Sequence, residues 1–170
     1  LVDARDGTAY LDLFTFFASN ALGMNHQALT GDPVFREDLL TAAVNKPSNS
    51  DVSSAPMARF VETFARVLGD PGLPHLFCVE GGALAVENAL KAAFDWKVRK
   101  NLAAGRGEKG SRILHFREAF HGRSGYALST TNTADPRKTK YYPKFDWPRV
   151  ENPKIRFGAD GPRLTREAEI

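Results

Sequence analysis

Two glycines near the middle of the sequence lie where a protein backbone can bind an anion. Gly81 and Gly82 separate the apolar run at 76–79 from an alanine-rich stretch that begins at Ala83. The first N–H groups of a helix have no partner within the helix and carry partial positive charge, so a helix that begins here could hold a phosphate group. Glycine is also common at such turns only because the chain reverses sharply. The residues alone leave both interpretations open.

A second cluster, from Phe120 to Arg123, follows the apolar run at 113–116. Phe120 can stack on a flat heteroaromatic ring, and His121 can hydrogen-bond to that ring or pack beside it. Gly122 allows a close approach of the backbone, and Arg123 can bind a carboxylate through two parallel hydrogen bonds. Taken singly, these are more often a core phenylalanine, a structural histidine and a surface arginine. Their occurrence together after an apolar run favours a ligand site.

Several other chemistries have no support in the sequence. It contains neither the Gly-Lys-Ser/Thr ending of a P-loop nor the Gly-x-Ser-x-Gly motif of esterases, and its four histidines are too dispersed for a metal site. Cys78 is the one cysteine, and its apolar surroundings indicate a small buried side chain and a reducing, cytoplasmic setting. The formal net charge is +3 and no stretch is apolar enough to span a bilayer, so we expect no nucleic-acid or membrane partner.

A parallel sheet is needed to bring the two clusters together. The run at 76–79 lacks alternation, which is typical of a strand covered on both faces, and 113–116 predicts a second strand. Residues 83–97 predict a helix whose exposed face carries Glu87 and Lys91 as a favourable pair. Its predicted buried stripe consists of Val86, Ala89, Leu90, Ala93 and Phe94. Strand, helix and strand at this spacing form a βαβ unit with both clusters at the carboxyl edge of the sheet.

The remaining pattern predicts a chain in two parts. Residues 1–50 form an N-terminal segment with a hairpin at 1–13, and residues 51–170 begin a larger α/β domain. Residues 54–68 predict a helix capped by Ser53 or Ser54 and ended by Gly69; its apolar stripe is Met57, Phe60, Val61, Phe64, Ala65 and Leu68. A loop is predicted at 45–51 and a helical pattern at 164–170. Because only two parallel strands are evident, we expect a fragment of a larger sheet.

At these residues the sequence resembles the class III, pyridoxal-phosphate-dependent ω-aminotransferases of fold type I. The general marks are LVDARDGTAYLDL, EGGALAVENALKAAFDW and FHGRS, and the stretches FTFFASNALGMNHQAL, NKPSNSDVSS and PKFDWPR are most similar to the branch whose amino donor is lysine. The resemblance covers about residues 1–150. It implies a parallel-rich sheet with flanking helices, a homodimer, and transfer of the terminal amino group of L-lysine to 2-oxoglutarate.

The resemblance also implies roles by position. Gly82 and Ala83 fall on the residues that hold the phosphate of pyridoxal 5′-phosphate, and Phe120 falls on the residue that stacks on its ring, with His121 beside it. Arg123 falls on an arginine that binds a substrate carboxylate. The family's Schiff-base lysine lies beyond the last residue, so we expect the chain alone to be inactive. Two alternatives remain: another ω-aminotransferase, such as one that uses ornithine, or a noncatalytic α/β module that binds a phosphorylated ligand.

Overall fold

The computed structural model describes residues 1–45, 51–133, 135–154, 157–158 and 161–162 of the chain. The chain divides into two compact units, which we call unit 1 (residues 1–76) and unit 2 (residues 77–170). Most of the predicted loop at 45–51 and the whole of the predicted helical pattern at 164–170 lie outside the described residues. The expected division into domains near residue 50 stays a prediction.

Unit 1 begins with the predicted hairpin. The backbones of Leu1 and Tyr10 exchange two hydrogen bonds of 2.8 Å, and Val2 forms an antiparallel bridge with Ala9. Helices α1 (Gln27–Thr30) and α2 (Pro33–Val44) follow. The Asp32 carboxylate caps α2, and Pro33 occupies its first position, where a missing N–H costs nothing.

Helix α3 (Ala55–Leu68) confirms the helix predicted at 54–68. The Ser54 hydroxyl accepts a hydrogen bond from the Met57 N–H at 3.4 Å, and Gly69 ends the helix as expected. The expected burial of the apolar stripe is wrong, because no described residue of α3 is buried and Leu68 is 68% exposed. Part of the stripe lines an open apolar groove together with residues 69–76, and the described part of unit 1 supplies no layer that covers it.

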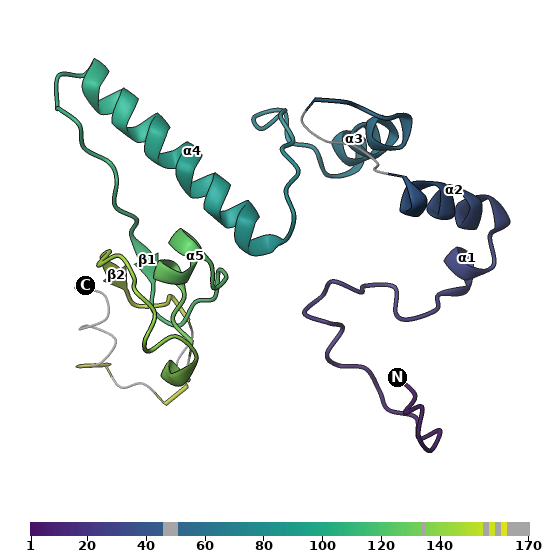
Figure 1. Cartoon of the computed structure of the whole chain (residues 1–170). Helices are drawn as coiled ribbons and strands as arrows, with labels where there is room; N and C mark the ends of the chain where they lie inside the picture. Colours follow the sequence, from purple (N-terminus) through teal and green to yellow (C-terminus); the bar gives the residue numbers. More distant parts are fainter. Residues whose placement is uncertain (46–50, 134, 155–156, 159–160, 163–170) are drawn as a thin grey trace. The chain divides into compact units, whose positions relative to one another are not determined.

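Unit 2 is built around helix α4 (Gly82–Ala103), which confirms and extends the helix predicted at 83–97. It continues with strand β1 (His115–Phe116), helix α5 (Gly125–Thr130), the 3-10 helix η1 (Pro136–Lys138) and strand β2 (Arg149–Val150). Strands β1 and β2 pair in parallel, with His115 opposite Arg149. Helix α5 packs on α4 and lies close to β1 (Figure 1).

The core of unit 2 contains an aromatic cluster that joins α4, α5 and the segment before β2. The rings of Phe145 and Trp147 stack with centroids 5.1 Å apart, and Tyr126 stacks on both. Phe94 of α4 meets Tyr126 and Trp147 edge-on, at 5.5 and 5.7 Å. Aromatic pairs in these geometries contribute about 0.5–1.5 kcal/mol beyond the burial of their area. The cluster therefore fixes α5 against the side of α4.

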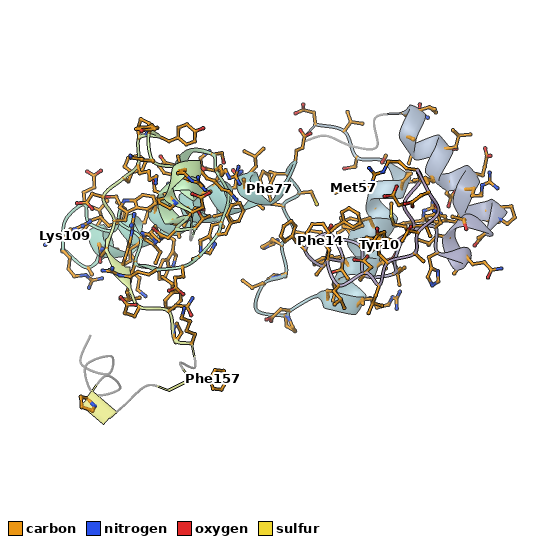
Figure 2. All side chains as sticks on the ribbon, turned by 90° about the horizontal axis from the view of Figure 1, so that it is seen from below. Tyr10, Phe14, Met57, Phe77, Lys109 and Phe157 are labelled. Carbon is orange, nitrogen blue, oxygen red and sulfur yellow. The ribbon has the colours of Figure 1, made fainter. Side chains whose placement is uncertain are left out.

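The strand expected at 76–79 is absent in this described stretch, which has no regular secondary structure. A strand needs a hydrogen-bonded neighbour, and β1 pairs with β2 rather than with this run. Without a covering layer Cys78 is exposed, contrary to expectation, and the side chain of Phe77 is 74% exposed (Figure 2). The prediction of a strand covered on both faces is therefore wrong for the described residues, which supply neither a pairing strand nor a cover for this run.

The face of α4 that is buried differs from the one predicted. Glu87, expected on the exposed face with Lys91, is buried beside α5 with only 7% of its surface exposed. Ala89 and Ala93, expected to be buried, are exposed. The spacing of apolar residues predicts the helix correctly but the wrong buried face. The face that carries Glu87 is buried because Glu87 hydrogen-bonds to residues of another element, at the start of α5. Neither α4 nor any other helix in the described part of the chain is long and apolar enough to cross a membrane.

Candidate functional site

The start of α4 presents backbone N–H groups without a side-chain cap. Gly81, the residue before the helix, has φ +85° and ψ 152°, a conformation that favours glycine. A Cβ added at Gly81 or at Gly82 would meet nothing within 4 Å, so the space beside both residues is open. The N–H groups of Gly82 and Ala83 lie in the first turn of α4, at the positive end of the helix dipole, where an anion is stabilised.

Gly122 places the second cluster directly against this helix start. A Cβ on Gly122 would lie 2.6 Å from the Cβ and 3.0 Å from the Cα of Ala83, distances that side chains do not tolerate. Its φ of +127° is also rare for any residue but glycine. The structure thus brings the glycine pair and the cluster at 120–123 together, and the close approach depends on the missing side chain of Gly122.

Phe120 and Arg123 lie next to each other on the exposed side of this loop. The phenyl ring of Phe120 is 59% exposed, and the guanidinium carbon of Arg123 lies 5.8 Å from the centre of the ring. A cation over an aromatic face at an exposed site contributes about 0.5–1 kcal/mol. The ring is free to stack on a planar ligand, and within the described residues the guanidinium group makes no ion pair that would occupy its donors.

The backbone at His121 and Gly122 is held by a buried hydroxyl that sequence analysis did not single out. Thr131, which is 1% exposed, accepts a hydrogen bond from the His121 N–H at 3.0 Å. Its own hydroxyl lies 2.6 Å from the Gly122 carbonyl oxygen and 3.1 Å from that of Ala127. The imidazole of His121 is exposed. Thr131 therefore fixes the path of the loop while the His121 side chain remains available.

Asn132 holds the first half of the same loop. Its backbone N–H donates to the Ala119 carbonyl oxygen at 2.6 Å, and its side-chain amide donates to the Phe116 carbonyl oxygen at 3.1 Å. Nothing in the local sequence marks a Thr-Asn pair after a short helix as a loop anchor, because its partners lie about ten to sixteen residues earlier. Such a role becomes visible only in three dimensions.

His115 lies below the loop in a buried setting. Asn132 Nδ2 lies 3.3 Å from its Nδ1, and Nε2 is buried without a hydrogen-bond partner among the described residues. Burial lowers the pKa of the His115 imidazole below its ordinary 6.5, and the nearby positive charge of Arg149 lowers this pKa further. The lowered pKa favours the neutral form of the imidazole.

A further glycine pattern does not form a site. Gly105, Gly107 and Gly110 have the G-x-G-x-x-G spacing of dinucleotide-binding turns. In that motif the glycines follow a strand and open a helix, whereas here they come after the end of α4. Gly110 instead packs against the side chain of Lys97, where an added Cβ would collide with it. The pattern belongs to the connection from α4 to β1.

Comparison with known proteins places the chain in a family. The family described as aminotransferase class III matches residues 1–158. An L-lysine-epsilon aminotransferase of Mycobacterium bovis is 65% identical over 99% of this chain and 38% of its own length. The protein of the same name from Streptomyces clavuligerus is 58% identical over 99% of the chain and 37% of its own length. The chain thus spans well under half the length of these relatives.

A solved structure is also similar. The lysine aminotransferase of Mycobacterium tuberculosis matches 99% of this chain and 39% of its own, with a TM-score of 0.90 and 63% sequence identity. This likeness confirms the α/β class and the fold type that the sequence predicts. It also accounts for the small sheet of unit 2, because the chain corresponds to only part of the solved protein.

Proposed function

Because the chain belongs to the class III aminotransferase family, we propose that it supplies the cofactor-binding start of a lysine aminotransferase. Class III aminotransferases in general depend on pyridoxal phosphate. The full-length protein transfers the terminal amino group of L-lysine to 2-oxoglutarate, giving glutamate and 2-aminoadipate 6-semialdehyde. From the same resemblance we infer a homodimer, and from the single cysteine we infer a cytoplasmic location.

The residues at the start of α4 fit the phosphate group of pyridoxal 5′-phosphate. A phosphate dianion needs several N–H donors and room for its oxygens. The N–H groups of Gly82 and Ala83 are the donors in this proposal, and the open space at Gly81 and Gly82 provides the room. The dipole of α4 contributes about 0.3–1 kcal/mol, so most of the affinity comes from direct hydrogen bonds.

The loop at 120–123 supplies the other contacts. Phe120 offers its exposed ring for stacking, and His121 lies beside it with its backbone fixed by Thr131. When bound, the cofactor supplies an electron sink for the amino group's carbon. Phe120 and His121 bind and orient it and limit the access of water to its face.

Arg123 binds a carboxylate of the substrate. Its guanidinium group is exposed, unpaired within the described residues, and held near the ring of Phe120. Arginine recognises a carboxylate through two parallel hydrogen bonds, which fixes direction as well as distance. This contact orients 2-oxoglutarate, or the glutamate formed from it, relative to the cofactor.

One observation carries the choice of lysine as donor: relatives named for lysine are 58–65% identical over nearly the whole chain. The test uses the full-length protein with pyridoxal phosphate and 2-oxoglutarate, and measures glutamate formed from L-lysine, L-ornithine or 4-aminobutyrate. We expect kcat/KM for lysine to exceed that for each other donor by about tenfold or more, because a pocket that fits one chain length rejects another.

Two results contradict the proposal. A higher kcat/KM for ornithine indicates a sibling ω-aminotransferase. Binding of pyridoxal phosphate without glutamate formation from any of the donors indicates a noncatalytic module that binds phosphorylated ligands.

A further inference from the structure

We propose that Glu87 is a positioning residue for the carboxylate site, which holds Arg123 at a fixed distance from the phosphate-binding start of α4. The inference rests on the proposed function, since it assigns how the cofactor end and the carboxylate end of one site are kept in register. Glu87 touches neither ligand; it acts through Ser124, Gly125 and Ala127, which follow Arg123 in the chain.

Glu87 joins α4 to the beginning of α5. Its Oε1 accepts a hydrogen bond from the Ala127 N–H at 2.9 Å and from the Ser124 hydroxyl at 3.3 Å. Ser124, the residue before α5, provides no cap with its own side chain. Glu87 thus supplies from another helix the acceptor that the first turn of α5 lacks.

Two glycines allow the segment around Arg123 to press against α4. Gly122 packs on Ala83, and Gly125 packs on Glu87, where an added Cβ would lie 3.0 and 3.1 Å from the two carboxylate oxygens. Ala83 and Glu87 are four residues apart and therefore lie on the same face of α4. The backbone on both sides of Arg123 is consequently anchored to one helical turn, and that turn begins at the proposed phosphate site.

Burying the side chain of Glu87 costs free energy that a residue with only a packing role would avoid. Its side chain is 7% exposed, and within the described residues no cation pairs with it. A buried carboxylate without a cation is unfavourable unless its hydrogen bonds compensate, and an apolar residue of similar volume avoids that cost. We infer that the carboxylate is present because two donors that follow Arg123, the Ser124 hydroxyl and the Ala127 N–H, need a fixed acceptor.

The experiment compares Glu87→Met, Glu87→Gln and Glu87→Asp in the full-length holoenzyme. Methionine keeps the volume and loses the acceptor, glutamine keeps the reach and an acceptor oxygen, and aspartate keeps the charge but is shorter by one methylene. Lys91→Met, one turn further along α4 on an exposed position, is the matched control. The readouts are KM for 2-oxoglutarate, the Kd of pyridoxal phosphate, and amide hydrogen exchange of residues 123–128 in the protein freed of cofactor.

We expect Glu87→Met to raise KM for 2-oxoglutarate about tenfold or more, as loss of hydrogen bonds to a charged group does. The Kd of pyridoxal phosphate should change by less than about threefold, and exchange at 125–128 should accelerate while that of α4 does not. Glutamine should restore KM better than aspartate, and Lys91→Met should match the wild type. A residue that merely stabilises the fold would lower the active fraction and leave KM unchanged.

The inference is overturned if Glu87→Met leaves both KM and exchange at 125–128 within about twofold of the wild-type values. If Glu87→Met does not fold, Glu87→Gln and Glu87→Asp are compared with the wild type instead. Equal KM values for 2-oxoglutarate in all three proteins also overturn the inference. Failure of the proposed function is a separate result: the wild-type holoenzyme then forms no glutamate, while hydrogen exchange in the cofactor-free variants still reports whether Glu87 holds the segment around Arg123.

Discussion

Units 1 and 2 each contain a helix that the sequence predicts clearly, but the two helices differ in how much of their surface is buried. Helix α3 in unit 1 has a Ser54 cap and a Gly69 stop, yet no described residue in it is buried. Helix α4 in unit 2 has no side-chain cap at its start, yet it packs against α5 and an aromatic cluster. Local capping therefore determines where a helix begins and ends, and contacts between distant segments determine whether it is buried.

The difference matters for the candidate site. In unit 2 the buried hydroxyl of Thr131 holds the loop at 120–123, and the buried carboxylate of Glu87 holds the start of α5 through partners up to 40 residues away. In unit 1, apolar side chains of α3 line an open groove instead of packing against another element. The proposed site therefore lies in the unit whose described residues hydrogen-bond to and pack against one another.

The largest expected effect comes from removing the centre of the aromatic cluster. Trp147 is 7% exposed, and Trp147→Ala should lower the free energy of opening of α5 by about 3–5 kcal/mol because it leaves a cavity. Phe60→Ala in α3, where the ring is half exposed, should cost less than about 1 kcal/mol. Native-state amide exchange of the 170-residue chain measures both. Equal losses would remove the contrast between the units.

A smaller effect is expected from closing the gap between the loop and α4. Gly122→Ala places a methyl group against Ala83 and should destabilise unit 2 by about 2–4 kcal/mol, from overpacking and from the positive φ together. Gly105→Ala is the matched control, since Gly105 also has a positive φ, of +68°, but has nothing within 4 Å. The difference in unfolding free energy between the two variants isolates the contact with Ala83. No difference would show that the close approach is not needed.

Loss of the carboxylate contact should affect binding without affecting the fold. In the full-length enzyme, Arg123→Ala should raise KM for 2-oxoglutarate by roughly 10- to 100-fold, as expected for a charge-assisted pair. The Kd of pyridoxal phosphate should change far less. Arg99→Ala, which removes an exposed arginine paired with Asp95 on α4, is the control and should leave KM unaltered. Unchanged 2-oxoglutarate kinetics in Arg123→Ala would count against the assigned role.

The smallest effect concerns pH. Because burial lowers the pKa of His115 below 6.5, the unfolded chain binds a proton that the folded chain does not in the range just below pH 6.5. The stability of unit 2 should therefore be fully present above pH 6.5 and decline as the pH falls through the lowered pKa. His115→Gln should flatten this decline, as measured by urea unfolding between pH 7.5 and 5. A decline of equal slope in the variant would assign it to other groups.

The two clusters proposed for the site can be recognised in the sequence because the residues of each are adjacent, and the structure brings the clusters together. Gly82 and Ala83 follow an apolar run, Phe120 to Arg123 follow another, and both groups meet through Gly122. The hairpin at 1–13 and the helix at 54–68 were predictable from turn and capping residues.

The residues that hold the loop at 120–123 and the start of α5 were not predictable, since their hydrogen-bond partners are distant in sequence. Periodicity placed Glu87 on the exposed face with Lys91, because a carboxylate four residues before a lysine normally forms a surface pair. Its actual partners, Ser124 and Ala127, are 37 and 40 residues away. The prediction of a strand at 76–79 is wrong for a different reason. Its apolar pattern requires a pairing strand and a covering layer, and the described residues provide neither.

The most direct test is a crystal structure of the full-length protein with pyridoxal 5′-phosphate bound. We expect phosphate oxygens about 2.7–3.2 Å from the backbone nitrogens of Gly82 and Ala83, with the ring of Phe120 parallel to the pyridine ring. A phosphate group bound elsewhere, with these N–H groups facing only solvent, would contradict the proposed site.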